Sequence, residues 1–309
     1  MSYSLVSREA RALVASTVGA ERVLITGASG WLGRTALDLI SPLNLPTLAL
    51  ASRSRTIRIA DHDIRCCQWD DEIVAAFAPT VILDCAFLTR NRLSDMTLAD
   101  YIAANRTLTG NLLSVTKLPS VRLVLTVSSG AAVYPMDALA GQIEGNPYGY
   151  LKREAEKSLS RIATDCGVVA VVARAWSISG AHVQNPQGYA LGSMILAASQ
   201  GRIHVTAKGR VYRRYVLAEE LLALGIAEGS VGSTTIDSGG ELIEMGNLAL
   251  RVAAVVRPDA AISRGEVDAR TIDSYHSDGL DWDRRCREWG LTSATLDRQI
   301  EETSRGILT

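Results

Sequence analysis

The chain has 309 residues, 47% of them hydrophobic, and its 32 basic and 33 acidic side chains leave a formal net charge of −1. This composition excludes an intrinsically disordered chain, which has little apolar surface to bury, and a polyanion-binding protein, which needs a basic excess. We therefore expect one large globular unit or two closely joined lobes that bind a small molecule, with no nucleic-acid partner.

Residues 1–21 are predicted to form an N-terminal helical extension. Leu13, Val14 and Val18 recur at helical spacing among polar neighbours, which indicates an amphipathic helix over residues 6–18. The segment lacks the basic start and apolar stretch of a signal peptide, and no apolar run in the chain approaches the roughly 18 residues that span a bilayer. We expect a cytoplasmic protein with no membrane partner.

Apolar runs alternate with segments of helical periodicity as far as residue 175. The runs that predict strands are residues 22–26, 47–51, 81–86, 121–127 and 168–174, and the segments that predict helices include 34–40, 98–113 and 148–164. Such alternation predicts an α/β fold over residues 22–175, a Rossmann-type doubly wound parallel sheet with helices on both faces.

The C-terminal part has a different pattern. Gly, Ser, Asn and Pro become frequent, with short helices and strands between them. We expect residues 176–309 to form mainly a smaller, interleaved α/β lobe that binds the substrate. Residues 234–237 resemble one more strand, so about 214–238 are expected to return to the Rossmann sheet.

A glycine-rich turn follows the first predicted strand and opens the first predicted helix. Its sequence is Gly27-Ala28-Ser29-Gly30-Trp31-Leu32-Gly33. Such a turn needs glycines where the backbone bends tightly, where it approaches a pyrophosphate and where helix meets strand. The helix then presents unpaired N–H groups and the positive end of its dipole to the phosphates. We expect a dinucleotide cofactor here.

The end of the second strand distinguishes the two dinucleotides. An acidic side chain would hold the ribose of NAD(H) there, but no Asp or Glu occurs between Asp38 and Asp61. The strand ends instead near Ser52, Arg53 and Arg55, and hydroxyl and guanidinium groups suit a 2′-phosphate. NADP(H) is therefore favoured over NAD(H). The alternative is that both arginines merely lie in solvent at the end of the strand and bind no phosphate.

Tyr148 and Lys152 share one helix face because they are four residues apart. A strand that runs into Ser128 and Ser129 precedes them, and ligands bind at the carboxyl edge of a parallel sheet. A tyrosine with a pKa of about 10 exchanges protons poorly near neutral pH, and a nearby ammonium lowers that pKa. We expect Tyr148 to move a proton during hydride transfer, Lys152 to assist it and bind ribose, and a serine to hold the substrate oxygen.

Together these segments resemble a known family. The glycine turn and residues 128–134 and 147–152 are similar to the extended short-chain dehydrogenase/reductases, the nucleotide-sugar epimerase/dehydratase group. The likeness continues around Asn105 and Arg174 and through residues 213–221. It therefore covers nearly the whole chain after the N-terminal extension.

The resemblance implies roles for individual residues. Ser129, Tyr148 and Lys152 would be catalytic, and Ser128, Ser129, Tyr148 and Arg213 would contact the substrate, with Arg213 on its diphosphate. Besides the glycines, Ser52, Arg53, Tyr148 and Lys152, the implied cofactor contacts are Ser29, Trp31, Leu32, Asp70, Cys85, Ala86, Phe87, Asn105 and Val127.

Two departures from the family pattern matter. Gly130 occupies the position where many relatives carry the catalytic Ser or Thr, so the role passes to Ser129, with Ser128 as the fallback. Relatives that dehydrate the sugar usually follow that hydroxyl with an acidic pair, whereas Ala131 and Ala132 follow here. Dehydratase activity is therefore not expected.

The resemblance implies an NAD(P)-dependent oxidoreductase that acts on a nucleotide-activated sugar, with a 4-ketoreductase using NADPH as the leading hypothesis. A nucleotide-sugar epimerase that retains its cofactor is the alternative, because the two share nearly all their machinery. A non-catalytic dinucleotide-binding protein and a reductase of a neutral ketone are further alternatives. Arg213 argues against the last, because a buried cation opposite a neutral substrate lacks a partner. A homodimer is implied through the helices at 98–113 and 148–164.

The remaining polar residues give weaker signals. No CxxC pair and no histidine at ligand spacing accompanies the cysteines, so we expect reduced thiols and no metal at Cys66, Cys67, Cys85, Cys166 and Cys286. Asp61 and Asp63 are expected in a solvated loop. Asp70 lies where the family contacts adenine, but a surface turn explains it equally well and Asp71 competes with it.

Overall fold

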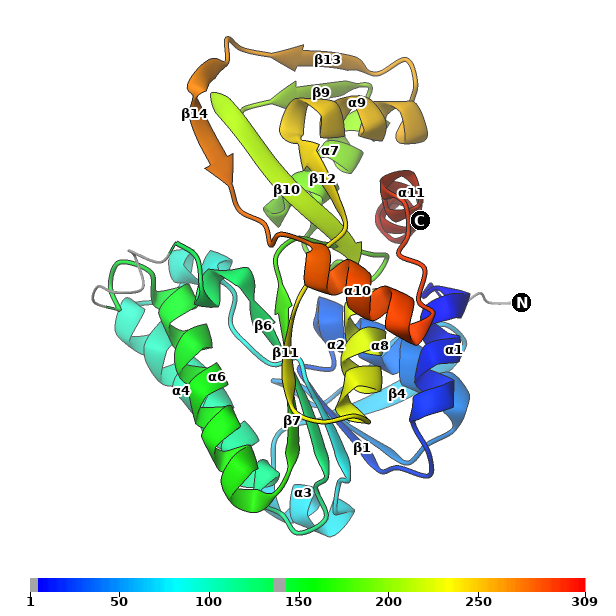
Figure 1. The fold of residues 1–309 in the computed structure, drawn as a ribbon, viewed down its shortest axis with the longest axis vertical. Helices are drawn as coiled ribbons and strands as arrows, with labels where there is room; N and C mark the ends of the chain where they lie inside the picture. The colour runs from blue at the N-terminus through cyan, green and yellow to red at the C-terminus, as the bar shows by residue number, and fades with distance from the viewer. Residues whose placement is uncertain (1–4, 136–142, 309) are drawn as a thin grey trace.

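The computed structural model describes residues 5–135 and 143–308, which form two lobes (Figure 1). The larger lobe, at the bottom of the figure, is built on an eight-stranded sheet, and the smaller lobe above it carries a four-stranded and a two-stranded sheet. The expected α/β class with a doubly wound, mostly parallel sheet is confirmed.

The large sheet has the strand order β11-β7-β6-β5-β1-β2-β4-β3. Its strands are β1 (Val23–Thr26), β2 (Thr47–Leu50), β3 (Arg55–Ile59), β4 (His62–Cys67), β5 (Val81–Asp84), β6 (Leu123–Ser129), β7 (Val169–Ala175) and β11 (Thr234–Asp237). All neighbours pair in parallel except β3 and β4. Because the order reverses between β1 and β5, the carboxyl ends of these two strands flank the crevice where such sheets bind ligands.

Helices cover both faces of this sheet (Figure 1). One face is covered by α1 (Arg8–Thr17), α2 (Trp31–Ile40), α8 (Ala218–Gly229) and α10 (Leu280–Trp289), and the other by α3 (Asp71–Phe77), α4 (Leu98–Thr116) and α6 (Pro147–Cys166). Every residue of α8 is buried, because the helix lies between the sheet and the outer helices. The described residues also form short 3-10 turns at η1 (Ser41–Leu43), η2 (Arg90–Ser94), η3 (Gly130–Ala132) and η4 (Pro186–Gly188).

The predicted N-terminal helix is present as α1. The Ser7 side chain accepts a hydrogen bond from the N–H of Ala10 at 3.1 Å, which caps the helix. Leu13 and Val14 are buried in the core of the large lobe, where α1 packs on α8. Within residues 5–135 and 143–308, no helix is both long and apolar enough to cross a membrane.

The hairpin of β3 and β4 lies where a solvated loop was expected. Asp61 is in its turn, after the left-handed residue Ala60, but Asp63 belongs to β4, so the loop prediction was wrong for that residue. Ile57 and Ile59 are buried and alternate with exposed residues, as in a strand with one buried face. This alternating run is too short to be recognised in the sequence. Both aspartates are exposed, as expected.

The smaller lobe has its own core. Its strands are β8 (Ile178–Ser179), β9 (Arg202–Val205), β10 (Gly209–Leu217), β12 (Glu241–Glu244), β13 (Ala261–Arg264) and β14 (Asp268–Ser274), and its helices are α7 (Ala190–Ser199), α9 (Met245–Val256) and α11 (Leu296–Leu308). Ile195, Ile203, Leu248 and Ile300 belong to a core cluster separate from those of the large lobe. Strand β10 runs from this lobe down to α8, so it joins the two lobes (Figure 1).

Candidate active site

The glycine turn lies between β1 and α2, at the crevice of the large sheet. Gly27 has a φ of 62°, and a β-carbon on it would lie 2.7 Å from the carbonyl oxygen of Cys85. A β-carbon on Gly33 would overlap the backbone of the turn itself. Gly30 begins α2 without a side-chain cap over the first N–H groups. This bare backbone cradle, bordered by the loop after β5, fits a pyrophosphate.

The other predicted residues of the turn anchor it. Trp31 contacts Tyr189 of the smaller lobe edge on, with the ring centroids 5.1 Å apart. Leu32 packs against the main core, and the carbonyl of Ser29 accepts a hydrogen bond from Arg34 Nε at 3.2 Å. These contacts fix the turn, and contacts of the three residues to a cofactor stay predictions.

Positive charge gathers around the end of β2. Ser52 and Arg53 are exposed directly after β2, and Arg55 is the exposed first residue of β3. Arg34, in the first turn of α2, was not singled out from the sequence. Burial lowers the pKa of its guanidinium, Cys66 opposes this effect, and the positive charge of Arg55 adds to it. The signal in the sequence was the position of Arg34 directly after the glycine turn.

Asp70 and Asn105 have structural partners. Asp70 Oδ1 accepts hydrogen bonds from two backbone N–H groups at 2.9 and 3.0 Å and caps α3, while Asp71 accepts one from Trp69. The buried Asn105 accepts a hydrogen bond from the N–H of Leu88 at 2.8 Å, which holds the loop after β5 beside the glycine turn. Neither arrangement tests a contact to a cofactor.

The two serines at the end of β6 have different partners. Ser128 donates to Glu156 Oε1 at 2.5 Å, inside the large lobe. The Ser129 hydroxyl lies 3.2 Å from the hydroxyl of Tyr275, and its interaction with Tyr148 lowers the pKa of that tyrosine. Ser129 is therefore the serine whose hydroxyl lies beside the tyrosine, and Ser128 is engaged by a carboxylate.

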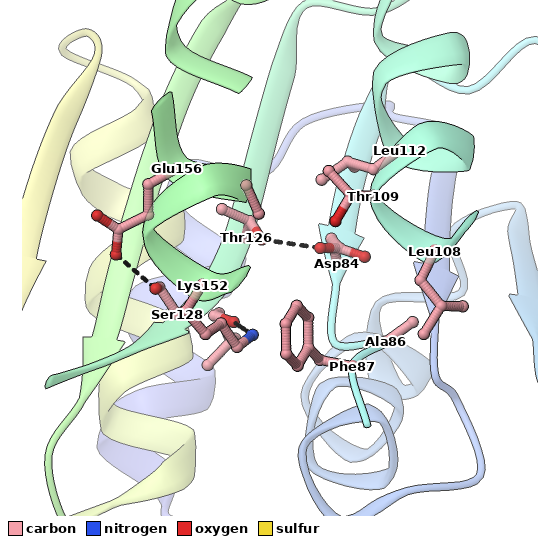
Figure 2. Close-up of a pocket in the computed structure, with 12 residues that line it drawn as sticks. Asp84, Ala86, Phe87, Leu108, Thr109, Leu112, Thr126, Ser128, Lys152 and Glu156 are labelled. Carbon is pink, nitrogen blue, oxygen red and sulfur yellow. Dashed lines mark hydrogen bonds between the residues drawn. The ribbon is translucent and has the colours of Figure 1, made fainter. Parts of the chain in front are cut away.

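Lys152 lies beside the aromatic ring of Phe87 (Figure 2). Its Nζ donates to the carbonyl oxygen of Val127 at 2.7 Å and lies 3.8 Å from the centroid of the Phe87 ring. The same ring packs edge on against Tyr148, with centroids 5.8 Å apart. Burial lowers the pKa of Lys152 to about 8, while the negative charge of Asp84 opposes this effect.

The pKa of Tyr148 differs from the expectation. Burial raises it, and the hydrogen bond with Ser129 opposes the rise. We expected the Lys152 ammonium to lower this pKa. In this structure the Val127 carbonyl and the Phe87 ring hold that ammonium, which accounts for the difference.

An aromatic wall, formed by Tyr134, Trp176 and Tyr275, borders the hydroxyl of Ser129. The ring centroids of Trp176 and Tyr275 are 4.9 Å apart, and those of Tyr134 and Tyr275 are 5.6 Å apart. A β-carbon on Gly130 would overlap the Trp176 ring, so a larger residue does not fit at position 130 without movement of that ring. Tyr275 was missed because it follows β14 in an unpatterned segment, with no spacing that links it to the serine.

Arg213, expected on a substrate diphosphate, borders this wall. It forms a two-pronged ion pair with Asp273, at 3.0 and 2.8 Å, and its guanidinium carbon lies 5.5 Å from the Tyr275 ring centroid. Its side chain is 21% exposed. Because Arg213 has a partner in its own lobe, the argument that a neutral substrate would leave it unpaired was wrong.

Comparison with known proteins identifies a related family. The model of the NAD dependent epimerase/dehydratase family matches residues 23–225. Comparison with curated protein sequences gives no match.

Solved structures share the fold over almost the full chain. An epimerase from Methanothermobacter thermautotrophicus is 17% identical with a TM-score of 0.74, and the match covers 97% of this chain and 96% of that one. A UDP-N-acetylglucosamine 4-epimerase from Methanobrevibacter ruminantium, in complex with UDP-N-acetylmuramic acid, is 16% identical with a TM-score of 0.76, covering 94% and 99%. A UDP-glucose 4-epimerase from Brucella ovis, in complex with NAD, is 18% identical with a TM-score of 0.73, covering 93% and 98%.

Proposed function

The chain belongs to the NAD dependent epimerase/dehydratase family, and from this premise we propose that it transfers hydride between a nicotinamide cofactor and a carbon of a nucleotide-activated sugar. One observation carries the proposal: Ser129 interacts with the hydroxyl of Tyr148, and this pair lies at the carboxyl edge of the sheet, the edge that also holds the glycine turn. That pair is the arrangement required to hold an oxygen and exchange its proton.

The residues of the site divide the work. The bound nicotinamide supplies or accepts the hydride. Ser129 donates a hydrogen bond to the substrate oxygen, and Tyr148 gives or takes the proton as that oxygen changes between carbonyl and alcohol. Lys152 leaves the Val127 carbonyl to bond the cofactor ribose, and its positive charge stabilises the phenolate of Tyr148.

The proposed cofactor is NADP(H). Support comes from the hydroxyl of Ser52 and the guanidinium groups of Arg34, Arg53 and Arg55 around the end of β2, where no carboxylate follows the strand. The Brucella epimerase was solved with NAD, so direct comparison of both dinucleotides on this protein is required.

The proposed reaction is 4-keto reduction of a nucleotide-linked sugar by NADPH. The aromatic wall offers rings that suit the sugar, and Arg213 offers a guanidinium for the diphosphate once Asp273 releases it. A second candidate is 4-epimerisation, which is the activity named for two of the neighbours above. An epimerase retains its cofactor, whereas a reductase consumes it.

Two incubations separate these reactions. With a UDP-, TDP-, CDP- or GDP-linked 4-keto sugar and NADPH, we expect the nicotinamide absorbance to fall in proportion to the alcohol formed. With UDP-glucose or UDP-N-acetylglucosamine and a substoichiometric amount of dinucleotide, an epimerase forms the C4 epimer without a net change in the nicotinamide absorbance. Absence of dinucleotide binding by calorimetry contradicts the proposed function.

A further inference from the structure

A small pocket lies beside Lys152, between β5, β6, α4 and α6 (Figure 2). Its volume is about 10 Å³, roughly the space that one water molecule requires. Asp84 and Glu156 line the pocket together with the lysine. The proposed reaction uses neither carboxylate.

Asp84 is oriented by its neighbours in the sheet. It is buried at the end of β5, in register with Thr26 on β1 and Thr126 on β6. Both threonine hydroxyls donate to its carboxylate, at 2.6 and 2.8 Å. Burial raises the pKa of Asp84, whereas these hydroxyls and the charge of Lys152 oppose the rise.

Glu156 differs from Asp84 because a guanidinium already neutralises it. Arg174 donates to both oxygens of Glu156, at 3.0 and 2.7 Å, and Ser128 donates to one of them. Asp84 accepts its side-chain hydrogen bonds from neutral hydroxyls, and the positive charge that lowers its pKa is that of Lys152. A buried carboxylate is costly unless a cation compensates its charge.

The other groups that face Lys152 complete its environment. The Val127 carbonyl and the Phe87 ring contact the ammonium directly. The Cys85 thiol lies nearby on the loop after β5, and burial raises its pKa, which favours the neutral form. Among the residues that the structure describes, the carboxylates of Asp84 and Glu156 are therefore the main negative charges that act on the lysine, and Arg174 pairs with Glu156 but not with Asp84.

We propose that Asp84 is a positioning residue, the charge partner across the small pocket that keeps Lys152 in its ammonium form. The inference rests on the proposed function, in which Lys152 must be charged to stabilise the phenolate of Tyr148. Asp84 contacts neither substrate nor reacting atoms, so it acts through the lysine. Its loss lowers the pH at which the lysine becomes neutral, and the alkaline limb of the turnover profile moves to lower pH.

The test measures the titration of Lys152 directly in the full-length protein. The sequence has four lysines, Lys117, Lys152, Lys157 and Lys208, so ¹⁵N-lysine NMR resolves the amino groups, and Lys152→Met identifies the signal. Asp84→Asn preserves the shape and keeps an acceptor for the threonine hydroxyls. We expect it to lower the pKa of Lys152 by about one unit or more and to shift the alkaline limb equally.

Matched variants separate this effect from a general loss of charge. Glu156→Gln should shift the Lys152 titration less than Asp84→Asn, because Arg174 already compensates Glu156. Asp63→Asn, at an exposed position on β4, should leave it unchanged. Equal shifts in all three variants would contradict a specific role of Asp84.

Thr126→Val keeps the test decisive if Asp84→Asn does not fold. It removes one hydroxyl donor and drives Asp84 toward its neutral acid, so the Lys152 pKa should fall by a smaller amount. An unchanged Lys152 titration in the folded variant overturns the inference, whatever the turnover. The titration needs neither cofactor nor substrate, so this failure is distinct from failure of wild-type protein to bind a dinucleotide, which overturns the proposed function.

Discussion

The indole ring of Trp176 fills the space beside Gly130 that a side chain at position 130 would occupy. Trp176 Nε1 donates to Asp237 at 2.7 Å, so the ring is held from its other end. The glycine and the tryptophan therefore form a matched pair, and Ser129 is the residue left to present a hydroxyl at the end of β6.

Gly130→Ser introduces the residue type that the family resemblance implies at position 130, but we expect it to destabilise the protein. The new β-carbon overlaps the Trp176 ring, and overpacking of this kind costs about 1–3 kcal/mol of unfolding free energy. Urea unfolding measures the change. In the Trp176→Ala background, where the ring is absent, Gly130→Ser should cost less unfolding free energy than it does in the wild type. A Gly130→Ser single variant as stable as the wild type would contradict the steric account.

Tyr148→Phe should lower turnover by about 100-fold or more, because the hydroxyl that exchanges the proton is removed. Dinucleotide affinity, measured by calorimetry, should remain that of the wild type. Tyr150→Phe is the matched control, because residues two apart on a helix do not share a face. Equal turnover in the two variants would remove Tyr148 from the mechanism.

Arg53→Ala should weaken NADP(H) binding by about tenfold or more and leave NAD(H) binding unchanged. A hydrogen bond to a charged phosphate contributes about 1.5–3 kcal/mol, and about 1.4 kcal/mol corresponds to tenfold in affinity. Calorimetry with both dinucleotides gives the comparison. Arg58→Ala, which removes an exposed cation paired with Asp63 on the same hairpin, is the control. Tighter binding of NAD(H) by the wild type would contradict the cofactor assignment.

The free energy of unfolding should fall as pH rises, because of two buried carboxyl groups at the start of α8. Burial raises the pKa of Glu219 from 4.5 to about 8 and that of Glu220 to about 7. The folded protein therefore binds more protons than the unfolded chain, so this contribution is full below pH 4.5 and is lost as pH rises to about 8.

Glu219→Gln isolates this contribution. In the wild type, Glu219 Oε1 accepts a hydrogen bond from the N–H of Ser7 at 3.3 Å. The amide oxygen of the glutamine can accept the same hydrogen bond. Between pH 5 and 8, the unfolding free energy of the variant should fall less than that of the wild type. The difference should be at least about 1 kcal/mol, which corresponds to a pKa shift of roughly one unit. Urea unfolding at both pH values measures it. Glu288→Gln, at an exposed position, should follow the wild type, and parallel curves for Glu219→Gln would contradict the effect of burial.

Local patterns predicted the parts of the fold and site that depend on neighbours in sequence. The glycine turn, the strand that ends at Ser129 and the helix with Tyr148 and Lys152 each have a spacing that shows in the chain. Tyr275 has no such signal, because its partner Ser129 is 146 residues away. Asp84 lies within the strand predicted at residues 81–86, but its environment depends on hydroxyls contributed by two other strands.

The return of the chain to the large sheet has a consequence for fragments of this protein. Residues after 175 build the smaller lobe, yet they also supply the buried helix α8, the edge strand β11 and the covering helix α10. A fragment that ends at residue 175 would keep the glycine turn and Lys152 but expose the apolar sheet surface under α8. No single cut in the chain therefore separates an intact large lobe from the smaller one, because the chain passes between the two lobes several times.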